Sequence, residues 1–357
     1  MHGGNLYEAI KAFGIKKEEI IDFSANINPL GLSQQIKDVL IANIDDVINY
    51  PDFECNELRE ELSVYTGMPK NSIITGNGAS EMLYLIFDVL KPKKILIPAP
   101  CFSEYEKAIK LIGSEIQFYE LKEDYNYRLS IPDLLQHISE DTDTILLCNP
   151  NNPTSTLIKK EELLGLIDYA NNRNINVIID EAFIELTVGC CDNSVVEYIS
   201  LYKNLFIIRA LTKIFAIPGL RLGYALGNVS VINAMWHRKI PWSVNSFACC
   251  LGNVFSLNRD YLQQTASWLA LEKEWLYSEL LNFSQLKIFK PDTNFILIKI
   301  LKKDLSASLL KNIIMEKRIL IRDASDFKFL NHKFFRIAIK ERANNKLLLE
   351  ALKQILN

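Results

Sequence analysis

The stretch LFIIRALTKIFAIPGLRLGYALG, residues 205–227, joins two short apolar runs and holds a lysine and an arginine between them. The outer runs, LFIIR and LGYALG, are typical of buried strands. Lys213 follows the first run, and Arg221 stands after a Pro-Gly turn. A lysine at a desolvated sheet edge has a lowered pKa and becomes a nucleophilic amine that can form a Schiff base. Arg221 would offer a bidentate fork to a phosphate, although an isolated lysine is more often a solvated surface residue.

Upstream of this stretch, further apolar runs alternate with amphipathic segments such as 80–90 and 159–173. The pattern of strand, helix and strand predicts an α/β fold with a central, mostly parallel sheet flanked by helices. The runs that we expect to form its other strands are SIIT (72–75), KKILIP (93–98), TILLC (144–148) and NVIID (176–180).

Beyond residue 229 the pattern changes to long helical stretches and shorter strands, which indicates a smaller α+β domain. Strands are expected at 294–300 and 334–339, with a closing helix near 341–355. In the long helical segment 261–281, one apolar face is expected to combine Trp268, Leu269, Leu271, Trp275 and Leu276.

The opening segment FSANINPLG (23–31) holds too little apolar surface to fold alone, so we expect it to pack on the C-terminal part. We therefore divide the chain into a large domain, 41–240, and a small domain formed by both termini, 1–40 and 241–357.

Composition and charge narrow the class of partner. The chain has 357 residues, of which 49% are hydrophobic and 23% charged, as in ordinary globular proteins. The formal net charge is −3 and no block of Lys or Arg stands out, so we expect neither nucleic acid nor a membrane as partner. The sequence shows no signal peptide and no spanning segment, and we expect a cytoplasmic protein that binds a small molecule.

Cysteine and histidine spacing predicts no metal site. The seven cysteines form an odd set without C-x-x-C spacing, and two pairs of them are adjacent. This suits neither a disulfide framework nor zinc, so reduced, buried thiols are expected. His137, His237 and His332 have no ligand-like spacing.

Three more polar signals follow expected strands, where open α/β sheets bind ligands. In GNGAS (76–80), the N–H groups of Ala79 and Ser80 could hold a phosphate at a helix N-terminus. Asn152 precedes Pro153, which favours an extended conformation that can aim its amide into the cleft. Asp180 ends a buried run and must find a cation or hydrogen-bond donors. Taken singly, GNGAS and the Asn152–Pro153 pair are more often simple turns, and Asp180 is as readily a helix N-cap. The joint placement of the signals predicts the site.

On the basis of these motifs, the chain resembles the fold-type I pyridoxal-phosphate (PLP) enzymes of the class I/II aminotransferase family over essentially its whole length. The resemblance implies PLP as cofactor, Lys213 as the lysine that binds it, Asp180 as partner of the ring nitrogen and Asn152 as donor to the ring hydroxyl. It also implies a set of further cofactor contacts: Gly78, Ala79, Ser80, Thr212 and Arg221 around the phosphate, Phe102 of APCFSEY (99–105) on the ring, and Tyr50 of NYPD (49–52) reaching the phosphate across a homodimer interface.

Two positions depart from the family pattern. Ala210 stands three residues before the lysine, where the family often has a hydroxyl residue. Phe183 stands where the related histidinol-phosphate aminotransferases have a tyrosine that bonds the ring hydroxyl. We expect one phosphate contact to be missing or replaced, and the pKa of the lysine–cofactor linkage to be altered.

The N-terminal region distinguishes subfamilies. HGGN (2–5), DFSANINPLG (22–31), DEAFIEL (180–186), PGLRLGY (218–224) and PWSVN (241–245) resemble the L-threonine-O-3-phosphate decarboxylases of cobamide biosynthesis. The resemblance implies that the phosphorylated amino acid is contacted by His2, Gly3, Asn26, Asn152, Arg322 and Arg336. The two guanidinium groups of Arg322 and Arg336 would suit a substrate with a carboxylate and a phosphate. The alternative is that both are surface arginines with no role in binding.

The sequence therefore supports three hypotheses. The first is PLP-dependent decarboxylation of L-threonine O-3-phosphate or L-serine O-phosphate to an amino-alcohol phosphate for the cobamide nucleotide loop. The second is a histidinol-phosphate-type aminotransferase, and the third a catalytically silent PLP-binding regulator, for which the chain lacks a DNA-binding appendage. Glu104 and Tyr105 could line the cleft, and a position on a helix face is the alternative that we favour.

Overall fold

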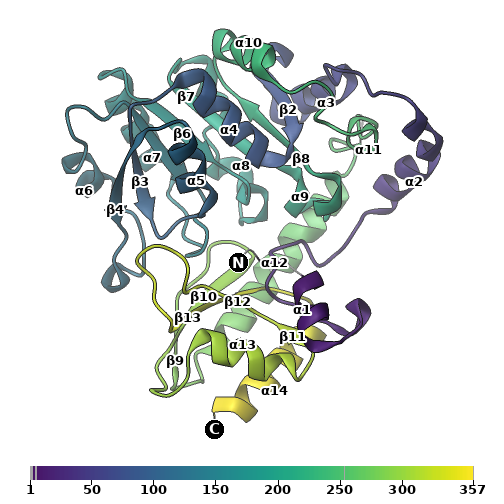
Figure 1. Cartoon of the computed structure of the whole chain (residues 1–357), viewed down its shortest axis with the longest axis vertical. Helices are drawn as coiled ribbons and strands as arrows, with labels where there is room; N and C mark the ends of the chain where they lie inside the picture. The colour runs from purple at the N-terminus through teal and green to yellow at the C-terminus, as the bar shows by residue number, and fades with distance from the viewer. Residues whose placement is uncertain (1–2, 5, 253, 357) are drawn as a thin grey trace.

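The computed structural model of the chain describes residues 3–4, 6–252 and 254–356, except the side chains of 190–191. Figure 1 shows a larger upper part built on one sheet and a smaller lower part built on another, with the N-terminus at their junction. The long helix α12 (Arg259–Leu280) runs from one part to the other.

Seven of the described strands form the large sheet, in the order β2-β8-β7-β6-β5-β3-β4. All neighbours from β7 to β4 pair in parallel, whereas β8 is antiparallel to both β7 and β2. The expected α/β fold with a mostly parallel sheet is confirmed. The strands are β2 (Ile73–Asn77), β3 (Lys94–Ala99), β4 (Glu115–Glu120), β5 (Thr144–Cys148), β6 (Asn176–Asp180), β7 (Leu205–Ala210) and β8 (Leu222–Leu226).

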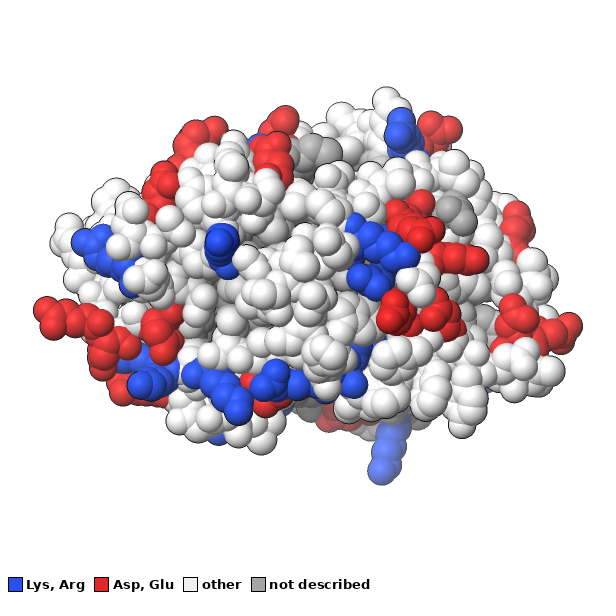
Figure 2. Space-filling view, turned by 90° about the horizontal axis from the view of Figure 1, so that it is seen from above, with Lys and Arg blue, Asp and Glu red and all other residues white. Residues whose placement is uncertain are grey.

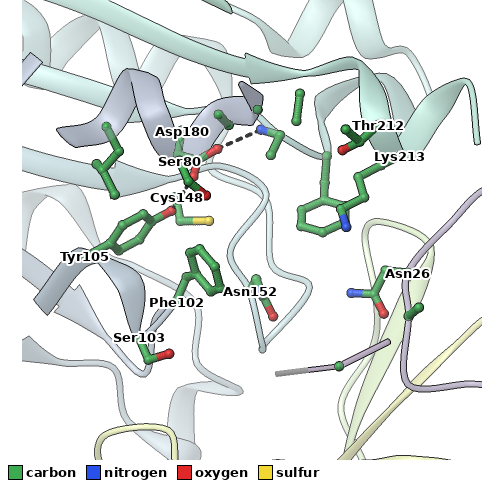
Figure 3. Close-up of a pocket in the computed structure, with 18 of the residues that line it drawn as sticks. Asn26, Ser80, Phe102, Ser103, Tyr105, Cys148, Asn152, Asp180, Thr212 and Lys213 are labelled. Atoms are coloured by element: carbon green, nitrogen blue, oxygen red, sulfur yellow. Dashed lines mark hydrogen bonds between the residues drawn. The ribbon is translucent and has the colours of Figure 1, made fainter. Parts of the chain in front are cut away.

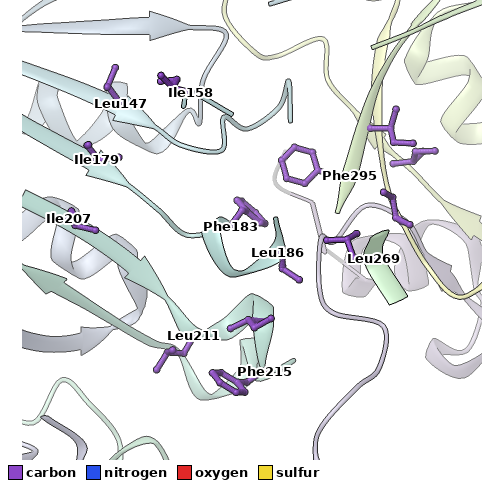
Figure 4. Close-up of a cluster of buried hydrophobic side chains, with 14 of the residues drawn as sticks. Leu147, Ile158, Ile179, Phe183, Leu186, Ile207, Leu211, Phe215, Leu269 and Phe295 are labelled. Atoms are coloured by element: carbon purple, nitrogen blue, oxygen red, sulfur yellow. The ribbon is translucent and has the colours of Figure 1, made fainter. Parts of the chain in front are cut away.

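Side chains on the central strands alternate between two apolar layers, because successive strand residues point to opposite faces. Leu146, Ile178 and Phe206 belong to the layer covered by α4, α5 and α10. Leu147, Ile179 and Ile207 belong to the other layer, with α3, α6 and α7, and lie in a row in Figure 4. The helices are α3 (Asn56–Thr66), α4 (Gly78–Leu90), α5 (Glu104–Leu111), α6 (Ile131–Gln136), α7 (Lys160–Asn171) and α10 (Val229–Arg238).

The small sheet is antiparallel throughout, with the order β12-β13-β10-β9. Phe295 of this part meets Phe183 of the large part at a ring distance of 5.0 Å, so the two cores are continuous (Figure 4). The elements are β9 (Leu286–Ile288), β10 (Phe295–Ile300), β12 (Arg322–Asp323), β13 (Phe334–Ala338), α13 (Ala307–Met315) and α14 (Arg342–Leu356).

One detail of the expected α12 face is wrong. Leu269 and Leu276 are buried in the main core and the two tryptophans pack against it, but Leu271 is 73% exposed. Leu271 lies two residues after Leu269, about 200° around the helix, and so points away from the side that carries the buried Leu269 and Leu276.

The N-terminal region packs on the C-terminal part. β1 (Ile21–Asp22) pairs in parallel with β11 (Ile319–Leu320). Beyond it, the Phe23 N–H donates to the Leu320 carbonyl, and the Ala338 N–H donates to the Phe23 carbonyl. Along the chain, α1 (Leu6–Phe13) precedes this segment and α2 (Gln34–Ala42) follows it. The domain boundaries at 41 and 240 stay a prediction.

The surface and the thiols add little that identifies a partner. The face in Figure 2 carries small groups of both charge signs separated by uncharged surface. Within the described ranges, no helix has the length and apolarity to cross a membrane, and no cluster of three or more metal-ligating side chains occurs. Cys55, Cys101, Cys148, Cys249 and Cys250 are free, whereas the side chains of Cys190 and Cys191 lie outside the described residues.

Candidate active site

A cavity of about 250 Å³ opens where β5, β6 and β7 end, between the two sheets (Figure 3). Cys148, Asp180 and Ala210 are the last residues of these strands and all line it. Parallel strands bring their carboxyl ends to one edge, and this topology collects residues that are far apart in the sequence.

The first turn of α4 forms one end of the cavity. Gly78, Ala79 and Ser80 line it together with Thr212 and Arg221, so the five residues expected around a phosphate lie in one place. Gly78 has φ +79°, and a Cβ there would lie 2.4 Å from Nη2 of Arg221. Only glycine lets the guanidinium approach the helix N-terminus this closely, which creates a place for an anion.

Lys213 stands on α9 (Leu211–Ile214), directly after β7, and its partly buried side chain extends into the cavity (Figure 3). Burial, together with the charges of Arg336 and Arg221, lowers the pKa of Lys213 to about 8. A substantial share of this amine is therefore neutral near physiological pH, as a nucleophile requires.

Asp180 is held by two donors. The Tyr105 hydroxyl donates to its Oδ2 at 2.7 Å, and the Ala182 N–H donates to Oδ1 at 2.9 Å. Burial raises the pKa of Asp180, and the two hydrogen bonds act in the opposite direction. Tyr105 is 1% exposed and lines the cavity, so of its two alternatives the cleft is correct and the favoured helix face is wrong. Glu104 pairs with Lys107 at 2.6 Å along α5 instead.

Behind Asp180, a buried ion pair joins the ends of β6 and β7. Arg209 Nε donates to Glu181 Oε2 at 2.9 Å, and Ser194 Oγ donates to both Glu181 oxygens at 3.0 and 2.9 Å. Glu181 follows Asp180 directly, so this pair fixes the backbone that carries the carboxylate.

Two aromatic rings and one amide side chain form the side walls of the cavity. Phe102 lines the cavity and meets the Tyr105 ring edge-on at 5.7 Å. Asn152 Oδ1 accepts a hydrogen bond from Arg336 Nη1. Phe183 and Ala210 also line the cavity, and neither supplies a hydroxyl at its position.

Two buried arginines face the cavity from the small sheet. Arg322 and Arg336 are 7% and 5% exposed, which excludes the alternative of two surface arginines. Arg322 Nη2 donates to both oxygens of Asp326, at 2.8 and 2.9 Å, and Arg336 Nη2 donates to the Ser24 carbonyl at 2.9 Å. Burial and the nearby Arg322 charge lower the pKa of Arg336. Such a pair of cations attracts an anionic ligand.

The N-terminal segment closes this side. Gly3 lines the cavity, and a Cβ on it would lie 2.2 Å from the Ser24 carbonyl oxygen, so only glycine fits there. The Gly4 N–H donates to Ser24 Oγ at 2.8 Å. Among the described residues, two buried atoms of this region have no hydrogen-bond partner, Asn26 Oδ1 and Arg336 Nε. His2 lies outside the described residues.

Tyr50 does not reach this cavity within its own chain. Its side chain is 81% exposed, and its ring lies 4.8 Å from that of Trp242. A contact with the cofactor of a second chain stays a prediction.

Ser24 and Cys148 line the cavity but are not among the site residues predicted from the sequence. Cys148 ends the expected strand TILLC, and that position at a strand end is a signal in the sequence. Tyr105 lies in the first turn of α5, and only the packing of this helix shows that its ring faces the cavity.

Comparisons with known proteins agree with this geometry. The family Aminotransferase class I and II matches residues 18–352. A threonine-phosphate decarboxylase from Salmonella typhimurium strain LT2 is 34% identical over 356 residues, which cover 99% of this chain and 96% of that protein.

Two solved structures are similar to this chain, and each alignment covers 94% of this chain and 98% of the chain in the solved structure. The histidinol-phosphate aminotransferase from Clostridium acetobutylicum has a TM-score of 0.87 at 33% identity. The L-threonine-O-3-phosphate decarboxylase from Porphyromonas gingivalis has a TM-score of 0.83 at 26% identity.

The fold and the lysine at its strand-end cavity define a fold-type I PLP-dependent enzyme. The chain belongs to the aminotransferase class I and II family. PLP, the cofactor expected from the sequence, is thereby confirmed.

The cavity offers matching groups for four parts of PLP: the aldehyde, the phosphate, the ring nitrogen and the ring face. A neutral amine at Lys213 suits the aldehyde, and the α4 N-terminus with Arg221 suits the phosphate. Asp180 suits a protonated ring nitrogen, and the Phe102 ring offers a stacking surface. The described residues therefore fit the cofactor.

Proposed function

We propose that this enzyme decarboxylates an O-phosphorylated α-amino acid, L-threonine O-3-phosphate or L-serine O-phosphate, and releases an amino-alcohol phosphate for the cobamide nucleotide loop. The observation that carries the proposal is the second anion site: the buried Arg322 and Arg336 face the cavity in addition to the α4 cradle. The 34% identity to a threonine-phosphate decarboxylase supports it.

In this proposal one end of the cavity holds the cofactor. Gly78, Ala79, Ser80, Thr212 and Arg221 bind its phosphate, and Tyr50 of a second chain completes the site in a homodimer. Asn152 and Phe102 orient the ring. When bound, PLP supplies an electron sink for a bond at the substrate Cα.

Asp180 keeps a proton on the ring nitrogen, and it can do so because Tyr105 and the Ala182 amide stabilise its carboxylate. Lys213 moves protons at its Nζ: a pKa of about 8 lets it release the proton to become a nucleophile and take one up to donate later to the substrate carbon.

The small-sheet side of the cavity selects the bond that breaks. Arg322 and Arg336, with His2, Gly3 and Asn26, bind the substrate phosphate. The substrate carboxylate is then left without a cationic partner. An ion pair with the bound carboxylate would stabilise the substrate more than the transition state, so its absence lets the carboxylate leave as carbon dioxide. Arg336 Nε is a buried donor without a partner among the described residues, and a bound phosphate would provide its acceptor.

The second candidate is a histidinol-phosphate-type aminotransferase, favoured by the 33% identity to the solved Clostridium acetobutylicum enzyme. In that reading an arginine holds the substrate carboxylate, and the Cα–H bond breaks instead. The same cofactor residues serve both reactions. The absence of a tyrosine at Phe183 favours the decarboxylase.

One experiment separates the two. Holoenzyme is mixed with L-threonine O-3-phosphate, and in parallel with L-serine O-phosphate, without any 2-oxo acid. The proposal predicts many turnovers, with amine phosphate and carbon dioxide formed in equal amounts. A reaction that stops after one equivalent, converts the cofactor to its amine form and resumes only with 2-oxoglutarate would show the aminotransferase. Comparison of kcat/KM for the two substrates identifies the preferred one.

A further inference from the structure

A second cavity, of about 340 Å³, lies away from the active site and is walled by three cysteines. Cys55 stands at the N-terminal end of α3, and Cys249 and Cys250 stand at the end of α11 (Ser246–Cys249). Cys55 is 3% exposed, whereas Cys249 is half-buried, and both line the cavity, so a small solute can reach them.

The sulfur atoms of Cys55 and Cys249 are 2.9 Å apart, although the two residues are 194 positions apart in the chain. A disulfide bond has a length of about 2.0 Å, so the two sulfurs need to move together by less than about 1 Å to bond. Each thiol is held by its own element and needs no large backbone movement to meet the other.

The surroundings of Cys55 favour its thiolate. The hydrogen bond from the Cys249 thiol is the largest of the causes that lower the pKa of Cys55, and the charge of Lys239 lowers it further, whereas burial and Asp52 act against them. Lys239 is 5% exposed, and among the described residues its Nζ has no hydrogen-bond partner. Lys239 Nζ lies 5.3 Å from the centroid of the Trp236 ring and 5.9 Å from that of Phe53, so these aromatic rings hold its charge in place. The N-terminus of α3 adds the positive end of a helix dipole beside Cys55.

Other described thiols lack this environment. Burial raises the pKa of Cys101 to about 12, and it raises the pKa of Cys148 as well. Cys250 borders the same cavity as the pair, but burial raises its pKa too. Oxidation should therefore concentrate on the Cys55–Cys249 pair.

We propose that Cys55 and Cys249 form a reversible intrachain disulfide when the protein meets a peroxide. The Cys55 thiolate attacks the peroxide O–O bond and becomes a sulfenic acid, with release of one water after proton transfer. Cys249 then attacks the sulfenic sulfur, the S–S bond forms, and a second water leaves. The two thiols lose two electrons and two protons, and the peroxide is reduced to two waters. A dithiol reductant reverses the change by exchange.

The bond would tie the start of α3 to the end of α11. The segment 49–54, which carries Tyr50, enters this junction directly, and the Tyr50 ring already packs against Trp242. The disulfide would therefore fix the segment that the proposed function assigns to the cofactor site of the partner chain. Only this last consequence rests on the proposed function.

The test uses full-length holoenzyme, fully reduced and then exposed to hydrogen peroxide. Peptide mapping by mass spectrometry should find Cys55 linked to Cys249 within one chain, and dithiothreitol should restore both thiols. Cys250→Ser is the matched control, since it borders the same cavity, and it should form the same link. Cys249→Ser should not form the link, and a dimedone probe should then trap Cys55 as its sulfenic acid, because the thiol that would attack it is gone.

Three results would overturn the inference: no Cys55–Cys249 peptide in the oxidised wild type, a link that joins two chains, or no dimedone label on Cys55 in peroxide-treated Cys249→Ser. A loss of decarboxylation in any of these proteins bears on the proposed function and leaves the peptide map interpretable. Conversely, failure of the proposed reaction leaves the thiol chemistry to be judged on the map alone.

Discussion

The Tyr105 hydroxyl donates a hydrogen bond of 2.7 Å to Oδ2 of Asp180, so a helix residue holds the carboxylate at the end of β6. The contact is buried, and burial alone would favour the protonated acid. The tyrosine and the Ala182 amide are what keep the carboxylate available to a protonated ring nitrogen.

Replacing Tyr105 by Phe should therefore weaken PLP binding. Loss of a hydrogen bond to a charged group costs about 1.5–3 kcal/mol, which corresponds to roughly tenfold to hundredfold in the dissociation constant. Titration of apoenzyme with PLP, followed by visible absorbance, measures the change. Tyr84→Phe is the control, because Tyr84 bonds Glu104 on the neighbouring helix and does not line the cavity. Equal affinities in the two variants would show that the Tyr105 hydroxyl does not support the cofactor site.

Lys213 should give the recombination of apoenzyme with PLP a characteristic pH dependence. The neutral amine is the reactive form, so the rate should rise with pH up to a pKa of about 8 and level off above it. Arg221→Gln removes one of the charges that lower this pKa, so its profile should shift to higher pH. Stopped-flow absorbance records both curves. A wild-type rate that still climbs steeply near the ordinary lysine value of about 10.4 would contradict the lowered pKa.

Gly78→Ala should damage the phosphate end of the cavity. Alanine at φ +79° is strained by about 1–2 kcal/mol, and its Cβ would collide with the Arg221 guanidinium. We expect weaker PLP binding, by roughly tenfold or more, and a lower Tm. Gly165→Ala in α7 is the matched control, because a Cβ at this position would have no neighbouring atom within 4 Å. This variant should keep the PLP affinity of the wild type and raise the free energy of unfolding by about 0.5–1 kcal/mol. A Gly78→Ala protein with wild-type affinity and Tm would disprove the close approach of Arg221.

The two buried arginines should discriminate phosphorylated from plain substrates. Arg322→Lys keeps the charge but loses the fork, so KM for L-threonine O-3-phosphate should rise about tenfold or more, while the residual rate with L-threonine stays the same. Steady-state kinetics with both compounds give the comparison. Arg318→Lys, an exposed position that pairs with Glu19, should behave as wild type. A parallel loss with both substrates would mean that Arg322 supports the fold rather than the phosphate.

The large sheet could be predicted because its strands are continuous apolar runs, buried on both faces. β4 is the exception: EIQFYE begins and ends with glutamate and lies at the edge of the sheet with its side chains partly exposed. Such a strand lacks the apolar run that marks its neighbours, and its identity depends on pairing with β3.

The candidate site was predictable to the same extent as the strands that carry it. Asp180 and Lys213 follow strands, so the topology of a parallel sheet brings them together. Tyr105 and Ser24 enter the cavity through the packing of α5 and of the N-terminal segment, and these are long-range contacts that no local pattern encodes. Arg322 and Arg336 could be noticed in the sequence, but their burial follows from the seam between the two sheets.

Lys213 is expected to carry PLP in a covalent linkage. This linkage can be tested by borohydride reduction of the holoenzyme, followed by digestion and mass spectrometry, with Lys213→Ala as the unlabelled control. We expect a phosphopyridoxyl mass on the peptide that contains Lys213 and on no other. A protein that stays colourless after incubation with PLP, with Lys213 unmodified after reduction, would contradict it.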